Sequence, residues 1–195
     1  MRILSLMVGT VMATGAVIIG LKVGTEPIEG IKLAARYTAR ASFLIFLPVF
    51  LASALYRLFP GYYTQALYRN RRRLGLSFAL VHTVHLAAFV TYFMAIQQPV
   101  PLLGAPAYVV LYAMGLTSND AAQKAMGPNW KRLHKTGFYV LWAAFTFAYT
   151  AKAVTGEEIA FTGPLALACY AALGLRYAAW RRKQAKVFAT YSQTH

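Results

Sequence analysis

Three of the four histidines in this chain fall where side chains could hold a cofactor inside a membrane bundle. His82 and His85 lie within an apolar stretch, 74–96, and His134 stands at the start of another, 133–154. A polar ring in lipid is costly unless it is satisfied, so an ionisable side chain there indicates a functional site. Because imidazole is a common axial ligand of haem iron, these residues point to haem binding.

The spacing of the histidines suggests how two helices could share one cofactor. His82 and His85 are three residues apart and project from the same broad side of a helix. If that helix enters the membrane at Leu74, they lie about 12 and 16 Å deep. A helix that begins near Pro128 puts His134 about 9 Å along it. These overlapping depths predict a planar macrocycle between the two helices, with an imidazole on each face.

Basic residues near the same helix ends could bind the acidic groups of such a cofactor. Arg72, Arg73 and Arg132 are the candidates for pairing with haem propionates or with the phosphate of a flavin. Each histidine has an alternative role as a hydrogen bonder between helices, and the arginines would also serve to orient the helices. The fourth histidine, His195, ends the sequence and is expected to be disordered.

The composition is that of an integral membrane protein. Of the 195 residues, 58% are hydrophobic and 13% are charged, and the mean hydropathy is +0.47. Soluble domains are usually about 45–50% apolar and about 25% charged. We therefore expect a single transmembrane domain over residues 1–195. The only cysteine, Cys169, excludes an internal disulfide or a cysteine-ligated cluster and is expected to pack as a small hydrophobe.

The apolar segments predict an all-α bundle of six transmembrane helices. A span needs roughly 20 predominantly apolar residues. The predicted spans are 3–21, 41–59, 74–96, 102–118, 133–154 and 161–180. Tyr and Trp near the span ends, Tyr108 and Trp130 among them, are expected to be interfacial anchors.

Two further features of the N-terminal part of the sequence each allow two interpretations. The segment 28–40 mixes apolar and charged residues, and could be an amphipathic helix at the interface or a polar linker that runs into the second span. Gly9 with Ala13, and Ala16 with Gly20, are small pairs four residues apart. They could permit close contact between helices of different copies, or simply pack within the bundle.

The positive charges predict the orientation of the bundle. With both termini in the cytosol, the outer side carries 5 of the 20 Lys and Arg residues, and the inner side carries the other 15. Such a bias orients helices with their basic ends inside, so we predict an N-in, C-in topology. The net charge of +15 falls in short clusters at the ends of the apolar segments. This placement argues against nucleic acid as a partner.

Several motifs together resemble a known family. Arg72-Arg73-Leu74-Gly75-Leu76, followed by His85, resembles the third helix of the ferric-reductase-like transmembrane domain family. Leu116-Thr117-Ser118 and the later Asn129–His134 resemble its fourth helix, inner loop and fifth helix. Glu26-Pro27-Ile28-Glu29 and Ala39-Arg40-Ala41 are similar to the bacterial haem-binding subunits that feed electrons to a periplasmic methionine sulfoxide reductase.

The resemblance implies a six-helix bundle with b-type haem between the third and fifth helices. His85 and His134 match the family's ligand motifs. Relatives of the methionine sulfoxide type usually carry another histidine about thirteen residues after the one matched by His134, and here that residue is Phe147. One haem b is therefore expected rather than two, with His82 as a possible replacement ligand and with flavin or quinone as further possible cofactors.

Three functions follow as hypotheses. The first is a multi-pass protein of the bacterial inner membrane, the electron-transfer subunit of an oxidoreductase system. It would pass electrons from a separate flavoprotein or quinol donor to a periplasmic acceptor protein. The second is a haem-free binding or assembly subunit with structural histidines. The third, a transporter or proton channel, is disfavoured because no Asp or Glu lies deep in a predicted span.

Overall fold

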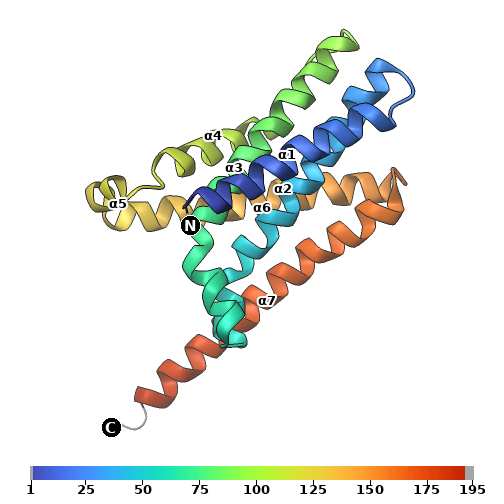
Figure 1. The fold of residues 1–195 in the computed structure, drawn as a ribbon. Helices are drawn as coiled ribbons and strands as arrows, with labels where there is room; N and C mark the ends of the chain where they lie inside the picture. Colours follow the sequence, from blue (N-terminus) through green and yellow to red (C-terminus); the bar gives the residue numbers. More distant parts are fainter. Residues whose placement is uncertain (1, 192–195) are drawn as a thin grey trace. The chain divides into compact units, whose positions relative to one another are not determined.

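The chain folds into helices joined by short connections. A computed structural model describes residues 2–191, so that His195 lies outside the described residues. The helices are α1 (Arg2–Val23), α2 (Pro27–Leu58), α3 (Tyr62–Ala95), α4 (Ala105–Leu116), α5 (Asp120–Met126), α6 (Pro128–Val154) and α7 (Ile159–Tyr191), with a 3₁₀ turn at Leu102–Gly104 (Figure 1). Within residues 2–191 there is no strand, which confirms the all-α fold class.

Four helices are long and apolar enough to cross a membrane. They are α1 over Leu6–Val23, α2, α3, and α7 over Ile159–Ala185, while Leu102–Leu116 forms a shorter apolar helix. Each of the six predicted spans coincides with helical structure. α6 has 27 residues, but Lys131, Arg132 and Lys135 fall in its first turns and make it less apolar. The structure thus supports a multi-pass membrane protein, and the number of six spans and the N-in, C-in topology stay predictions.

Helix α2 begins earlier than predicted and absorbs the segment 28–40. Pro27 occupies the first helical position, where its missing N–H costs nothing. The Oε2 atom of Glu29 accepts hydrogen bonds from the Thr25 backbone N at 2.9 Å and from the Thr25 hydroxyl at 2.6 Å. No separate interfacial helix forms in this described segment, which continues directly into the second span as a regular helix.

Helix α5 was not predicted. Its seven residues follow Asn119, whose side chain accepts a hydrogen bond from the backbone N of Ala122 at 2.7 Å and so caps the helix. Gly127, at φ +51°, ends it in the left-handed region. Pro128 then starts α6, at the position the sequence predicted.

Two compact units divide the chain. The first comprises residues 1–46 and 72–141, and the second comprises residues 47–71 and 142–195. The boundaries fall inside α2, α3 and α6, so each of these helices contributes to both units. The expectation of a single domain stays a prediction.

In the first unit, aromatic side chains form the core between α2, α3 and α6. Phe43, Phe46 and Phe78 are almost completely buried. The ring centroid of Phe46 lies 5.3 Å from that of Phe78 and 6.2 Å from that of Phe138. This aromatic cluster brings together the two helices that carry the three candidate histidines.

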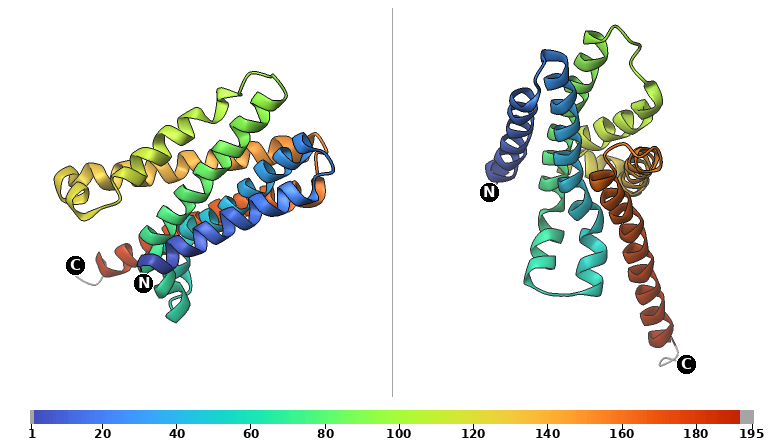
Figure 2. Two further views of the ribbon diagram at one scale, coloured as in Figure 1. Left: turned by 45° about the horizontal axis from the view of Figure 1, so that its top comes forward. Right: turned by 90° about the vertical axis from the view of Figure 1, so that its right-hand side faces the viewer.

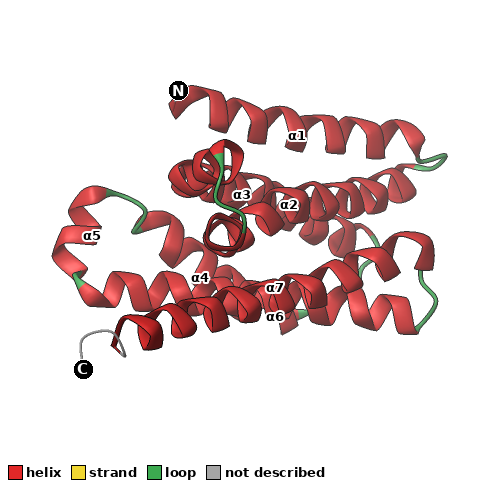
Figure 3. Ribbon diagram, turned by 90° about the horizontal axis from the view of Figure 1, so that it is seen from below, coloured by secondary structure: helices red, strands yellow, loops and turns green. Residues whose placement is uncertain are grey.

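Helix α1 runs alongside the first half of α2 (Figures 2 and 3). A Cβ atom at Gly20 would overlap the backbone of Ala34, so the absence of a side chain lets α1 and α2 approach closely. A Cβ at Gly9 would lie 3.1 Å from that of Ser77 on α3. Of the two roles considered for the small residues of α1, these contacts support packing within the bundle.

In the second unit, the end of α2 and the start of α3 form a helical hairpin (Figure 2). The rings of Tyr56 and Tyr68 stack across it at 5.4 Å. α7 is held by Trp142, whose Nε1 donates a hydrogen bond to the carbonyl of Cys169 at 2.9 Å. Cys169 is fully buried, as expected of a small hydrophobe in the packed interior.

Candidate functional site

His85 is held by the backbone of α2. Its Nδ1 lies 2.9 Å from the carbonyl oxygen of Ala35 and 3.5 Å from the hydroxyl oxygen of Thr38. A carbonyl oxygen can only accept a hydrogen bond, so the proton of the neutral imidazole must be on Nδ1. Nε2 then carries the lone pair, and it has no hydrogen-bond partner among the described residues.

His82 lies one turn before His85, with their ring centroids 5.2 Å apart. Its Nδ1 is 3.0 Å from the hydroxyl oxygen of Ser42 on α2. Its ring stacks on Phe78 at 5.3 Å and on Tyr108 of α4 at 4.9 Å. With 8% of its surface exposed, His82 is more deeply buried than His85, and it is packed between aromatic rings.

His134 belongs to a different group of contacts, at the end of α4. Its Nε2 lies 3.3 Å from the hydroxyl oxygen of Thr117. That hydroxyl also lies within hydrogen-bond distance of the carbonyl of Ala113, at 2.7 Å. The ring also stacks on Trp130 with centroids 4.0 Å apart.

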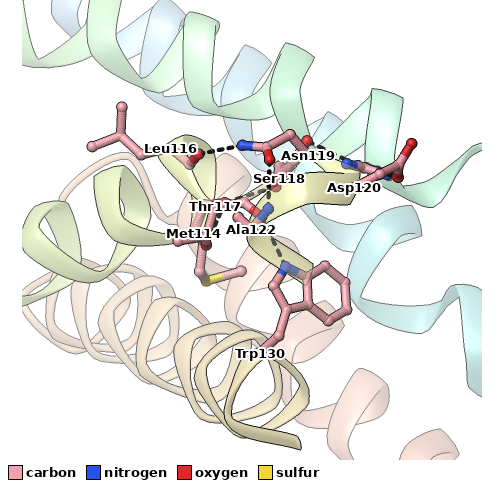
Figure 4. Close-up of polar contacts among 9 residues, drawn as sticks. Met114, Leu116, Thr117, Ser118, Asn119, Asp120, Ala122 and Trp130 are labelled. Carbon is pink, nitrogen blue, oxygen red and sulfur yellow. Dashed lines mark hydrogen bonds and ion pairs between the residues drawn. The ribbon is translucent and has the colours of Figure 1, made fainter. Parts of the chain in front are cut away.

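The segment that joins α4 to α5 collects further polar contacts (Figure 4). Trp130 donates from Nε1 to the carbonyl of Thr117 at 2.8 Å. Arg72, at the start of the α3 part of this unit, donates from Nε to the carbonyl of Ser118 at 2.8 Å and forms an ion pair with Asp120. We call this group, Arg72, Thr117, Ser118, Asp120 and Trp130, the α4–α5 latch.

The structure joins two of the three predicted histidines, His82 and His85, by a ring contact. His134 has its polar contact with Thr117 and its ring contact with Trp130. Tyr108 of α4 stacks on His82, whereas Thr117 contacts His134, nine residues further along. At 1.5 Å per residue this is about 13 Å along the helix. Ligation of one cofactor by both His85 and His134 stays a prediction.

The predicted arginines differ in how far they are already engaged. The guanidinium of Arg72 is bound within the α4–α5 latch, so an acidic group of a cofactor would have to compete with Ser118 and Asp120. Arg73 is half-buried, and Arg132 is exposed. Their role in cofactor binding stays a prediction.

The residues fit haem best at His85. A ligating histidine usually donates its other N–H to a carbonyl or carboxylate, which fixes the ring and its tautomer. The Ala35 carbonyl does this for His85 and leaves Nε2 available. His134 has its Nε2 hydrogen-bonded to Thr117, so ligation through that atom requires a change of partner.

Sequence reasoning missed the partners of the histidines. Thr38 and Ser42 stand four residues apart in an apolar helix, and this pair of hydroxyls was an available signal. Tyr108 and Trp130 were expected to be interfacial anchors. Each also stacks on a histidine, and the indole N–H of Trp130 donates inside the α4–α5 latch. Their role as anchors stays a prediction.

Known proteins similar to this chain share one description. The "Protein-methionine-sulfoxide reductase heme-binding subunit MsrQ" of Salmonella enteritidis PT4 is 28% identical over 170 residues, which cover 80% of this chain and 81% of the relative. The proteins of the same name from Salmonella newport and Salmonella heidelberg are 29% identical over 170 residues, covering 80% of each chain.

The chain resembles MsrQ. This confirms the resemblance to the haem-binding subunits of methionine sulfoxide reductase that the sequence motifs indicated. No family model matches the chain. No solved structure matches it either. The similarity to MsrQ extends over most of both proteins, and it includes the helices that carry His82, His85 and His134.

Proposed function

We propose that this protein is a haem-binding membrane subunit that carries electrons for a methionine sulfoxide reductase system. The observation that carries the proposal is the hydrogen bond from His85 Nδ1 to the Ala35 carbonyl at 2.9 Å. It orients the ring and leaves Nε2 as the donor atom for iron. The name of the MsrQ relatives supports the same cofactor.

The proposed cofactor is haem b, with His85 as an axial ligand. Haem, when bound, supplies reversible one-electron exchange. The chain supplies a fixed imidazole, an apolar surrounding and helices that exclude water. His134 is the proposed second ligand. For ligation through Nε2 it must exchange its contact with Thr117. A second haem is not proposed, because Phe147 on α6 offers no ligand atom.

The proposed setting is the bacterial inner membrane. Electrons would enter on the cytosolic side from a separate flavoprotein or quinol and leave to a periplasmic acceptor protein. In this proposal the chain acts as the membrane electron-transfer subunit of an oxidoreductase system. Arg72, Arg73 and Arg132 are the proposed partners of acidic cofactor groups at the cytosolic end.

The test is spectral and uses the full chain, purified in detergent after expression with added haem precursor. Reduction with dithionite should produce the sharp bands of six-coordinate low-spin haem, with about one haem per chain by extraction. A His85→Ala variant should lose most of the bound haem. Thr83→Ala is the matched control, because Thr83 lies two residues away on the exposed side of α3, with its hydroxyl bonded to its own helix.

A haem-free binding or assembly subunit is the second candidate. It is favoured by the hydrogen bonds that all three histidines make inside the protein. This alternative predicts a colourless protein that retains no iron, whose stability falls when the histidines are replaced. An unchanged haem spectrum in the His85→Ala protein would remove the ligand assignment from the leading proposal.

A further inference from the structure

The face of α2 that meets the two neighbouring histidines has an unusual hydrogen-bonding character. It consists of Ala35, Thr38 and Ser42, at spacings of three and four residues, which place them on one side of the helix. Ala35 is 6% exposed, and the other two are fully buried. We call this surface the α2 acceptor face, for the reason that follows.

Both hydroxyl protons on this face are used within α2. Thr38 donates to the carbonyl of Ala34 at 2.7 Å and to that of Ala35 at 3.0 Å. Ser42 donates to the carbonyl of Ala39 at 2.8 Å. A hydroxyl has a single proton, so only oxygen lone pairs are left to face α3. Together with the Ala35 carbonyl, this makes the surface one that only accepts hydrogen bonds.

An acceptor-only surface determines which ring nitrogen of a neutral histidine bears the proton. The Nδ1 of His82 faces Ser42 at 3.0 Å, and the Nδ1 of His85 faces Ala35 at 2.9 Å. The Ala35 carbonyl can only accept, so Nδ1 of His85 carries hydrogen and its Nε2 carries a lone pair. With the Ser42 proton bonded to Ala39, the same arrangement applies to His82. The contact from Thr38 to His85 at 3.5 Å has the same polarity and is the weakest of the three.

We infer that the α2 acceptor face is a positioning surface that fixes His82 and His85 in the Nδ1–H tautomer and so presents His85 to iron through Nε2. The assignment of His85 as a ligand rests on the proposed function, whereas the tautomers rest on the hydrogen bonds alone. Ser42 and Thr38 are positioning residues, since they act through the imidazoles.

The same geometry gives His82 a different role from His85. Its ring stacks on both Phe78 and Tyr108, and Tyr108 also donates a long hydrogen bond, 3.5 Å, to the backbone carbonyl of His82. These contacts hold His82 beside the ring of His85, 5.2 Å away, so His82 supports that ring.

The experiment is nitrogen NMR of the full chain, as purified, with ¹⁵N-labelled histidine and reduced with dithionite. Six-coordinate low-spin ferrous haem is diamagnetic, so the spectra can be recorded with haem bound or without it. His82→Gln and His85→Gln variants assign the signals. We expect both rings to carry hydrogen on Nδ1, and both protons to exchange slowly with solvent.

Ser42→Ala then tests the acceptor face without removing a histidine. It should accelerate exchange of the His82 Nδ1 proton roughly tenfold, as expected for the loss of one buried hydrogen bond, and should leave the His85 proton slow. Ser42→Thr, which restores a hydroxyl, should return exchange towards the original rate. Thr83→Val on the exposed side of α3 is the control and should change neither signal.

The outcomes separate this inference from the proposed function. Hydrogen on Nε2 of either ring, or unchanged exchange in Ser42→Ala, would overturn the positioning role even if haem is present. A colourless protein with both rings in the Nδ1–H form would reject the haem proposal and leave the tautomer inference standing. Retention of haem bands in His82→Gln and their loss in His85→Gln are expected, and the reverse pattern would refute the division of roles.

Discussion

Replacing Arg72 by Gln should weaken the attachment of α3 to the α4–α5 latch. The guanidinium makes two contacts of different quality there. Its Nε donates to the Ser118 carbonyl at 2.8 Å, and its Nη1 pairs with Asp120. The side chain of Arg72 is 34% exposed, whereas that of Asp120 is 84% exposed. Solvent therefore screens the ion pair much more than it screens the hydrogen bond.

These exposures set the expected magnitudes. A solvent-exposed ion pair contributes about 0.2–1 kcal/mol to the free energy of unfolding. A hydrogen bond from a charged donor contributes roughly 1.5–3 kcal/mol when buried, and we take the lower end for this partly exposed arginine. Arg72→Gln should thus cost about 2 kcal/mol, and Asp120→Asn well under 1 kcal/mol.

The assay is reversible unfolding in mixed detergent micelles, followed by circular dichroism. Arg69→Gln is the control, because Arg69 is exposed and has no ion pair or hydrogen-bond partner among the described side chains. Arg72→Lys keeps the charge but loses the planar fork, so it should recover only part of the stability. An Asp120→Asn protein as unstable as Arg72→Gln would refute the reasoning, since the exposed ion pair would then dominate.

The other predictions concern indole and glycine contacts. Trp130→Phe keeps an aromatic ring on His134 but removes the Nε1 donor, and should lower the free energy of unfolding by about 1 kcal/mol in the same assay, whereas the half-exposed Trp180→Phe should have little effect. Gly20→Val should cost about 1–3 kcal/mol, because its Cβ overlaps α2 backbone, and Gly15→Val should be nearly neutral, because a Cβ there meets nothing within 4 Å. Equal thermal stability of the two valine variants would contradict the close α1–α2 packing.

Apolarity along the sequence was enough to predict the long helices, though not α5, because hydrocarbon requires every backbone group to be satisfied within its own segment. It predicted their ends less well. α2 extends to Pro27 through a segment with Lys32, Arg36 and Arg40, where transfer to lipid is unfavourable but helix formation is not. Hydropathy measures the first of these properties only. Residue 41, the predicted start of the second span, marks where the sequence becomes continuously apolar. The helix itself begins earlier, at Pro27.

The histidines could be selected from sequence, but their partners could not. A spacing of three residues shows that His82 and His85 share a side of α3, and it does not show which helix they face. Helix rotation decides this, and rotation follows from the packing of Phe46, Phe78 and Phe138 in the aromatic core. The depths of the two histidine helices were likewise counted from separate starting points. Counting residues from each helix start gives no information about α4. His82 contacts Tyr108 of that helix, whereas His134 contacts Thr117 at its end.

His85 and His134 have the same side chain, but each contacts a different oxygen atom, and this contact determines which ring nitrogen is engaged. The Ala35 carbonyl leaves the lone pair of His85 on Nε2, at the far end of the ring from its support. In His134 it is Nε2 itself that is engaged, 3.3 Å from the Thr117 hydroxyl. Only the first arrangement both anchors the ring and exposes the atom that is better placed to reach a bulky cofactor. The group that each ring meets on the neighbouring helix therefore differs, and a sequence gives the ring but not that group.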